Sequence, residues 1–178
     1  MSTCPLCQGT AHPYFRDKRR SFSLCPRCSG IFTDPEFLPL PRAEHLRYLQ
    51  HQNQPLDTGY RASVQPLIDV VLKRQSPTQT GLDYGAGPQS AVSVMLAESG
   101  FELKLYDPLF HPEPAMLQRP YDFVICCEVI EHFHNPRFEF GRLREMLARG
   151  GRLYIKTALF DAQARPFGDW YYKNDFTH

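Results

Sequence analysis

Three short apolar segments between residues 81 and 136 each stop where a glycine or an acidic residue begins a turn. The segments span 81–84, 102–106 and 123–127, and they are followed by Gly85, Asp107 and Glu128. Their length and apolar character are typical of buried strands in a parallel sheet. In an open α/β sheet, ligands bind outside the carboxyl ends of the strands, so all three turns would face one crevice. The pattern therefore predicts an α/β fold, with helices on both faces of the sheet and a ligand site at one edge.

The first of these turns reads Asp83-Tyr84-Gly85-Ala86-Gly87. Glycine lets the backbone approach a ligand closely, which a Cβ would block. The dinucleotide-binding fingerprint expects a further glycine or alanine at position 90, where this chain has Ser90. Asp107 follows Gly87 by 20 residues, at a strand end where a carboxylate can accept hydrogen bonds from ribose hydroxyls. The spacing indicates a cofactor that contains a nucleoside, and it disfavours an NAD-dependent oxidoreductase.

Two of these motifs resemble class I S-adenosylmethionine-dependent methyltransferases. Asp83-x-Gly85-x-Gly87 is similar to the first motif of that family, and the Glu-Val-Ile-Glu-His run at 128–132 is similar to its fourth-strand signature in the branch that includes O-methyltransferases of quinone biosynthesis. The likeness covers about residues 60–178 and implies a Rossmann-like sheet, S-adenosylmethionine as the cofactor and direct in-line methyl transfer to an unidentified acceptor. The cofactor-binding residues that it implies are Tyr60, Asp83, Gly85, Ala86, Gly87, Asp107, Pro108, Leu109, Cys127 and Glu128.

His132 ends the 128–132 run and His134 follows it by two residues. The resemblance places these histidines on the substrate side. His132 could act as general base for a hydroxyl nucleophile, with His134 as the second candidate, because the pKa of histidine lies near working pH. The alternative is that these rings only pack or cap a loop, since the sulfonium is already activated and alignment supplies much of the rate. The aromatic segment 170–178 suits a small organic substrate. A small-molecule acceptor is expected, and an RNA or protein acceptor remains open.

The N-terminus contains two Cys-x-x-Cys pairs, Cys4/Cys7 and Cys25/Cys28, with 17 residues between them. This spacing is typical of a four-cysteine zinc site, and the Cys-Pro-x-Cys knuckles resemble a zinc ribbon. About 30 residues bury too little core to fold alone, so a metal would supply much of the folding energy. The alternatives are redox or unliganded thiols and an iron–sulfur centre. Zinc, in a closed structural site, is the prediction.

A basic cluster at residues 16–20 lies between the two cysteine pairs. It could contact nucleic acid phosphates, and this supports an alternative function, a degenerate methyltransferase fold that binds RNA or protein through its ribbon. The whole chain has a formal net charge of only +1, which favours a solvated turn instead. No apolar run approaches the ~20 residues that span a bilayer, and the N-terminus does not resemble a signal peptide. A cytoplasmic location is therefore expected.

The expected division is a zinc ribbon at 1–33, a proline-rich linker and N-terminal lid segment at 34–59, and a methyltransferase domain at 60–178. Helices are predicted at 44–50, at 60–74, from a first turn that contains Pro88 to a stop before Gly100, and at 137–148, where Gly150-Gly151 would end the last helix before a strand at 152–157. The residues expected to face inward from the second helix are Val64, Leu67, Ile68, Val71 and Leu72. Those expected to face inward from the third helix are Ala91, Val94, Met95 and Leu96. The family's sixth and seventh strands are not in the sequence, so we expect either a truncated chain or a partner that covers the sheet edge.

Overall fold

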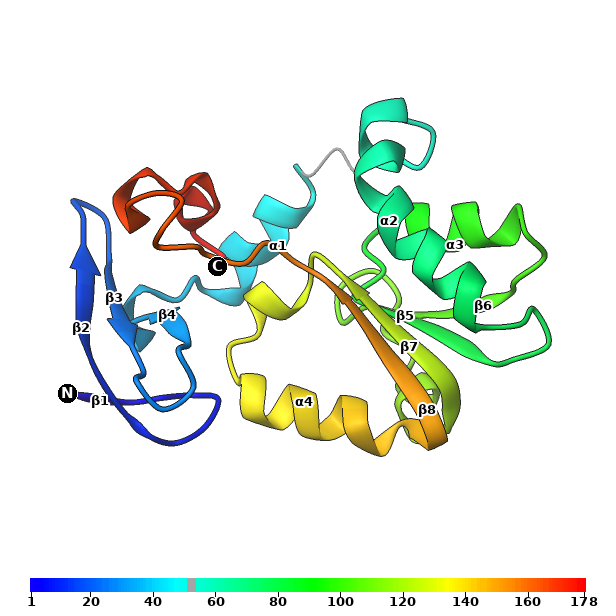
Figure 1. Cartoon of the computed structure of the whole chain (residues 1–178), viewed down its shortest axis with the longest axis horizontal. Helices are drawn as coiled ribbons and strands as arrows, with labels where there is room; N and C mark the ends of the chain where they lie inside the picture. The colour runs from blue at the N-terminus through cyan, green and yellow to red at the C-terminus, as the bar shows by residue number, and fades with distance from the viewer. Residues whose placement is uncertain (51–53) are drawn as a thin grey trace. The chain divides into compact units, whose positions relative to one another are not determined.

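The computed structural model describes residues 1–50 and 54–178. By contacts between residues these form two compact units (Figure 1). One unit consists of residues 1–44, 131–139 and 158–178, and the other of residues 45–130 and 140–157. We call them the ribbon unit and the sheet unit. The division into 1–33, 34–59 and 60–178 stays a sequence prediction, and residues 51–53 of its linker lie outside the described residues.

The sheet unit is built on four parallel strands in the order β6-β5-β7-β8. Their bounds are Gly81–Tyr84 for β5, Leu103–Tyr106 for β6, Tyr121–Cys127 for β7 and Leu147–Lys156 for β8. From β5 the chain first adds β6 on one side and then β7 on the other. The strand order therefore reverses at β5, and the crevice at such a switch point is the usual ligand site of an open α/β sheet.

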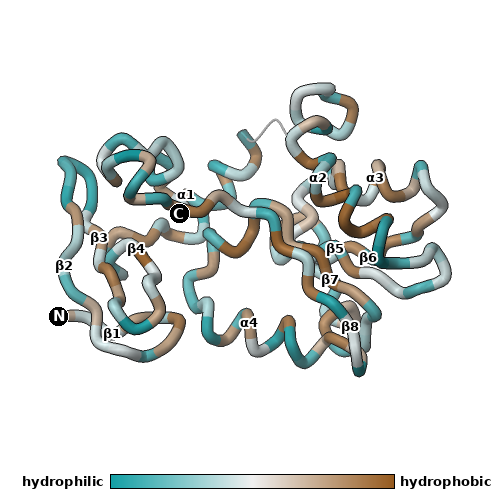
Figure 2. Tube along the Cα trace, viewed as in Figure 1, coloured by the Kyte–Doolittle hydropathy of each residue, from teal (hydrophilic) through white to brown (hydrophobic). Residues whose placement is uncertain are grey.

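Helices α2 (Thr58–Arg74) and α3 (Ala91–Ala97) pack on each other and on one face of this sheet. Their apolar side chains enclose Phe123 and Ile125 of β7, and Figure 2 shows hydrophobic colour on parts of these helices and of the central strands. The predicted inward residues of these two helices are confirmed except for two. Leu72 and Val94 are exposed on the helices, and Val92 is buried in place of Val94.

The opposite face of the sheet is also covered, because side chains alternate along a strand. Leu82, Val124 and Cys126 point away from the α2/α3 core and are fully buried. The C-terminal half of α4 (Pro136–Glu145) contributes the buried Leu143, and the Arg142 guanidinium donates to the Tyr84 hydroxyl at 3.3 Å. The α/β prediction with helices on both faces is thus confirmed.

Two predicted helix boundaries are wrong. Pro88 precedes the helix instead of opening it, because the side chain of Ser90 caps α3 by accepting from the Ser93 N–H at 2.8 Å. Helix α4 ends at Glu145, and Gly150-Gly151 lies inside β8. The pairing with β7 shifts register between Tyr121 and Phe123, and Gly150 has a φ of +79°. The glycines therefore serve a strand irregularity.

The ribbon unit begins with four short antiparallel strands in sequential order. They are β1 (Ser2–Thr3), β2 (Thr10–Arg16), β3 (Ser21–Leu24) and β4 (Ile31–Thr33). Helix α1 spans Pro41–Tyr48, slightly earlier than predicted. Five 3-10 helices complete the described part of the chain, and they are η1 (Pro35–Phe37), η2 (Pro114–Gln118), η3 (Ile130–His132), η4 (Phe167–Asp169) and η5 (Tyr171–Asn174). None of the described helices is long and apolar enough to cross a membrane.

Residues 158–178 give the ribbon unit an aromatic core that the sequence did not suggest. The buried ring of Phe167 has its centroid 5.4 Å from Phe15, 5.0 Å from Phe22 and 5.1 Å from Phe160. Arg20 is only 6% exposed. It donates to the main-chain carbonyls of Lys173, Asp175 at 2.5 Å and His178 at 2.8 Å. This segment is therefore fastened to the ribbon by rings and by one buried cation.

Candidate functional site

The turn after β5 is held by the end of β6. The N–H groups of Gly85 and Ala86 both donate to the carbonyl of Tyr106, at 2.8 and 3.1 Å. The N–H of Gly87 donates to Oδ2 of Asp107 at 3.0 Å. All three donors of the turn are thus satisfied inside the protein, in contrast to a phosphate-binding loop, which directs such groups at its ligand.

The two glycines of the turn are required for different reasons. Both have positive φ, +80° at Gly85 and +62° at Gly87, which favours glycine. A Cβ on Gly85 would lie 2.6 Å from Cγ2 of Val129, so this position is closed by packing. A Cβ on Gly87 would meet no heavy atom within 4 Å. The open side of the turn, where a ligand has room to approach, is therefore at Gly87.

Asp107 sits at the end of β6 and is 8% exposed. In addition to the Gly87 contact, its Oδ1 accepts from the N–H groups of Leu109 at 2.8 Å and Phe110 at 3.1 Å. A carboxylate offers about four acceptor positions, so three hydrogen bonds leave capacity for a ligand hydroxyl. The backbone of Asp107 also pairs with His111, which closes a tight loop that carries the exposed Pro108 and half-buried Leu109.

Asp83 lies beneath the same turn and is 2% exposed. Burial raises the pKa of this carboxyl to about 6, the Ser90 hydroxyl that donates to Oδ2 opposes the rise, and the negative charge of Asp107 adds to it. Because the charge of Asp107 raises the pKa of Asp83, the two carboxyl groups lie close to each other and to the same turn. The turn thus has one acidic side chain on β5 and another at the end of β6.

The remaining predicted cofactor residues come from β7 and from the start of α2. Glu128 has a left-handed φ of +55° directly after β7, and its carboxylate pairs with Lys156 Nζ at 2.5 Å. Such backbone conformations cluster at functional sites. Burial raises the pKa of Tyr60, and the charges of Cys127, Asp83 and Glu128 raise it further. Tyr60, Asp83, Cys127 and Glu128 therefore lie around one region at the carboxyl ends of β5 and β7.

The two histidines predicted to be catalytic belong to the ribbon unit. Nδ1 of His132 lies 3.2 Å from the carbonyl oxygen of Thr177, and its ring centroid is 4.7 Å from that of His178. Nε2 of His134 lies 3.4 Å from the Glu44 carboxylate. The structure therefore gathers the ten predicted cofactor residues in the sheet unit and gives each histidine a polar partner of its own in the ribbon unit.

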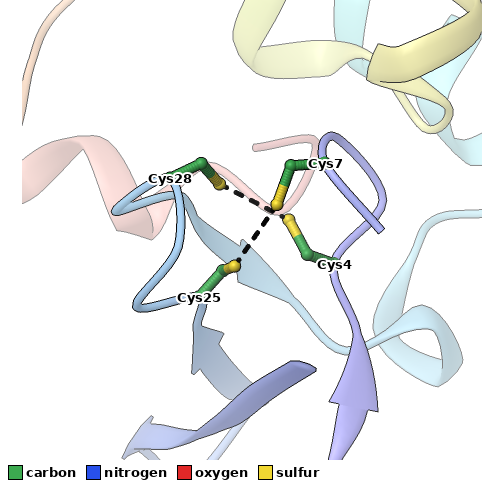
Figure 3. Close-up of side chains that lie close together, drawn as sticks. All are labelled: Cys4, Cys7, Cys25 and Cys28. Atoms are coloured by element: carbon green, nitrogen blue, oxygen red, sulfur yellow. Dashed lines mark hydrogen bonds between the residues drawn. The ribbon is translucent and has the colours of Figure 1, made fainter. Parts of the chain in front are cut away.

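The four N-terminal cysteines converge, as Figure 3 shows. Cys4 and Cys7 come from the β1–β2 knuckle, Cys25 and Cys28 from the β3–β4 knuckle. The sulfurs of Cys4 and Cys28 are 3.7 Å apart, and those of Cys7 and Cys25 are 3.5 Å apart. Burial, together with contacts to the other thiols, raises the pKa of Cys28 to about 12. Four soft donors at these distances fit one tetrahedral metal ion.

Sequence reasoning missed several polar partners. In the sequence, Ser90 was used only as evidence against a dinucleotide-binding fingerprint. In the structure its hydroxyl donates to Asp83 and caps α3. A serine directly before an apolar helix was the available signal. No local signal marked Lys156 as the partner of Glu128, or His178 as the neighbour of His132. In each pair the two residues are far apart in the sequence.

Comparisons of this chain with known protein families and with individual relatives agree with one another. A family model described as a methyltransferase domain matches residues 47–178. The ubiquinone biosynthesis O-methyltransferase of Cronobacter sakazakii is 29% identical over 133 residues, which are 70% of this chain and 54% of that protein. The Salmonella newport protein of the same name is 27% identical over 130 residues, covering 68% of this chain and 52% of its own length. The chain thus spans about half the length of the curated relatives it matches.

Among solved structures, the chain resembles a Burkholderia thailandensis 1,6-didemethyltoxoflavin-N1-methyltransferase with bound 1,6-didemethyltoxoflavin and S-adenosylhomocysteine. The TM-score is 0.51 at 16% identity, and the match covers 85% of this chain and 75% of that one. At this identity the likeness shows the fold alone. Because the family model covers well over half of the chain, and the sheet order and strand-end motifs agree with it, the chain belongs to the class I S-adenosylmethionine-dependent methyltransferase family.

Proposed function

We propose that this protein binds S-adenosylmethionine at the carboxyl ends of β5, β6 and β7 and transfers its methyl group to a small-molecule acceptor. One observation carries the cofactor assignment. The three N–H donors of the turn at 85–87 are consumed internally, and two acids flank the turn. Such a turn offers a pyrophosphate none of its three main-chain donors, and its two acids suit a ligand that carries positive charge. S-adenosylmethionine carries a sulfonium and an ammonium group.

Each predicted residue has a specific role in this proposal. Asp107 accepts a ribose hydroxyl with its remaining acceptor capacity, while Pro108 and Leu109 flank the adenine. Gly87 provides the open backbone beside the ligand, and Ala86 lies in the same turn. Asp83 and Glu128, the latter paired with Lys156, supply polar groups for the amino-acid part, next to Tyr60 and Cys127. The support for these roles is the shared position of these side chains at the strand ends.

Bound S-adenosylmethionine supplies a methyl group on a positively charged sulfur. An acceptor nucleophile forms a bond to the methyl carbon while the carbon–sulfur bond breaks, the electron pair goes to sulfur, and S-adenosylhomocysteine leaves. Where the nucleophile is a hydroxyl, its proton must be accepted. We assign that role to His132 in preference to His134. The Thr177 carbonyl can only accept, so Nδ1 of His132 is the protonated nitrogen and its lone pair is on Nε2, whereas Nε2 of His134 lies 3.4 Å from the Glu44 carboxylate.

The acceptor class is inferred from relatives. The curated relatives are named as O-methyltransferases of ubiquinone biosynthesis, so an aromatic hydroxyl on a small molecule is the first acceptor to test. The alternative, a degenerate methyltransferase fold that binds RNA or protein through its ribbon, has less support. Arg20, part of the basic cluster proposed to contact phosphates, is buried against main-chain carbonyls and is not on the surface.

We further propose that Cys4, Cys7, Cys25 and Cys28 bind one structural zinc ion. The support is their convergence within ligand distance and the softness of four thiolate donors. The ion would hold the two knuckles of the ribbon together.

Calorimetric titration tests the cofactor proposal. We expect saturable binding of S-adenosylmethionine and S-adenosylhomocysteine and no binding of NADH at the same concentrations. A methyl-transfer assay with a panel of catechols and phenols then tests the acceptor class. Failure of the assay with retained cofactor binding would reject the acceptor, and absence of cofactor binding would reject the function.

A further inference from the structure

The ribbon unit contains a second polar cluster that the proposed function does not use as a unit. Glu131, His132 and His178 each place one potential ligand atom within 4.8 Å of the other two. Glu131 and His132 belong to the short helix η3, and His178 follows η5. All three side chains are half-buried. The cluster joins two distant segments of the chain, because His132 contacts Thr177, which follows it by 45 residues.

Both imidazoles in this cluster are fixed in the same tautomer. Nδ1 of His132 lies 3.2 Å from the carbonyl oxygen of Thr177, and Nδ1 of His178 lies 2.7 Å from that of Tyr172. A carbonyl oxygen accepts and never donates, so each Nδ1 must carry the proton. Each neutral ring therefore has its lone pair on Nε2. Metal-binding histidines typically donate their second ring N–H to a carbonyl in this way.

The third member is held in place as well. The hydroxyl of Tyr172 donates to Oε1 of Glu131. The same tyrosine accepts from His178 through its carbonyl, and its ring centroid is 4.2 Å from that of His178. One residue thus orients two of the three potential ligands. A carboxylate and two imidazoles that are each hydrogen-bonded from behind form an outer shell like that of natural metal sites.

We propose that Glu131, His132 and His178 bind one divalent first-row transition metal ion. Two imidazoles and a carboxylate leave coordination positions open, and sites of this composition hold catalytic zinc or non-haem iron. The donors differ in softness from the four thiolates of the ribbon, so the two sites have different metal preferences. The open positions would take an oxygen ligand, such as water or the hydroxyl of a small molecule.

This inference goes beyond the proposed function and does not depend on cofactor binding. It does have a consequence for His132. A lone pair that binds a metal ion cannot accept a proton at the same time. In the metal-loaded protein His132 is therefore a ligand and not a general base, and a hydroxyl bound to the ion would be acidified by the metal instead.

The test uses the full chain loaded with one equivalent of Zn²⁺, which the four soft thiolates take first, followed by titration with Co²⁺. We expect one further metal equivalent, with an absorption spectrum free of sulfur-to-cobalt charge transfer. His178→Ala and Glu131→Gln should lose this equivalent. Tyr172→Phe, which keeps the ring and removes the hydroxyl, should weaken Co²⁺ binding about 10- to 100-fold. His134→Ala is the matched control and should bind Co²⁺ like the wild type.

The ribbon zinc and near-ultraviolet circular dichroism report whether each variant is folded. If His178→Ala does not fold, Glu131→Gln and Tyr172→Phe decide the question. The proposal is overturned if the wild type loaded with one zinc equivalent takes up no Co²⁺. It is equally overturned if folded Glu131→Gln and Tyr172→Phe bind Co²⁺ with wild-type affinity.

Discussion

The main-chain N–H of Gly87 donates to Oδ2 of Asp107 at 3.0 Å, across 20 residues of sequence. This bond joins the turn after β5 to the end of β6, and the carboxylate is fixed from its other side by Leu109 and Phe110. The position of Asp107 is therefore set by the protein before any ligand arrives. Such preorganisation lowers the ordering cost of binding.

The two glycines of the turn should respond differently to alanine. Gly85→Ala introduces a Cβ 2.6 Å from Val129 in a left-handed backbone, and we expect it to lower the free energy of unfolding by about 2–4 kcal/mol. Gly87→Ala has open space and should cost about 1 kcal/mol, yet weaken S-adenosylhomocysteine binding at least about tenfold. Urea unfolding and calorimetry give both quantities.

Gly141 in α4 is the matched control for this pair, because a Cβ there also meets no heavy atom within 4 Å. Gly141→Ala should stabilise the helix by about 0.5–1 kcal/mol and leave binding unchanged. Equal binding by Gly87→Ala and the wild type would refute the role of the open side of the turn.

Asp83 should make the stability depend on pH. Its pKa is raised from 3.8 to about 6 by burial, so the folded protein holds this proton more tightly than the unfolded chain. The stabilisation by the neutral carboxyl is full below about pH 4 and is lost as the pH rises through about 6. Asp83→Asn stays neutral, so its stability relative to the wild type should rise by roughly 2 kcal/mol between pH 4 and 7. Denaturant unfolding at several pH values measures it, and a pH-independent difference would contradict the account.

Removal of the ribbon zinc should unfold the four-stranded ribbon. Cys25→Ser replaces a fully buried ligand and should leave the protein with one zinc equivalent fewer than the wild type. Cys126→Ser changes an equally buried cysteine on β7, outside the cluster, and should keep full zinc content. Zinc is measured by elemental analysis after gel filtration. Retention of full zinc content by folded Cys25→Ser would rule out the four-cysteine site.

Arg20 should be needed for the order of residues 171–178. Arg20→Ala leaves three carbonyl acceptors without their donor and should destabilise the ribbon unit by about 2–4 kcal/mol. Arg19→Ala, at the exposed neighbouring position, should change stability by less than about 0.5 kcal/mol. Hydrogen exchange of the 171–178 amides reports the difference. Similar protection in both variants would show that Arg20 does not fasten this segment.

The parts of the fold that the sequence predicted are those encoded locally. Strands β5, β6 and β7 are apolar runs, and the turn at 85–87 is marked by its glycines. The strands and the turn could therefore be placed to within about two residues. The convergence of the four cysteines followed from a spacing rule with a geometric basis. Acids at strand ends could be grouped because parallel strands share one carboxyl edge.

The parts that were missed depend on contacts distant in sequence. The aromatic core around Phe167 pairs residues from opposite ends of the chain, and no periodicity at 158–178 signals its partners. Gly150-Gly151 looked like a helix stop because glycine has that role more often than a place inside a strand. The tautomers of His132 and His178 are set by two carbonyls of residues 172–177, which the sequence could not reveal.

The central claim, a binding site for S-adenosylmethionine at the strand ends, is tested most directly by calorimetric titration of three proteins with S-adenosylhomocysteine. The wild type should bind at one site. Asp107→Asn should bind about 10- to 100-fold more weakly, since a hydrogen bond to a charged acceptor contributes about 1.5–3 kcal/mol. Asp122→Asn changes an acid at the opposite end of β7, where it accepts from Thr80, and should bind like the wild type. Absence of binding by the wild type, or equal affinity in Asp107→Asn, would contradict the claim.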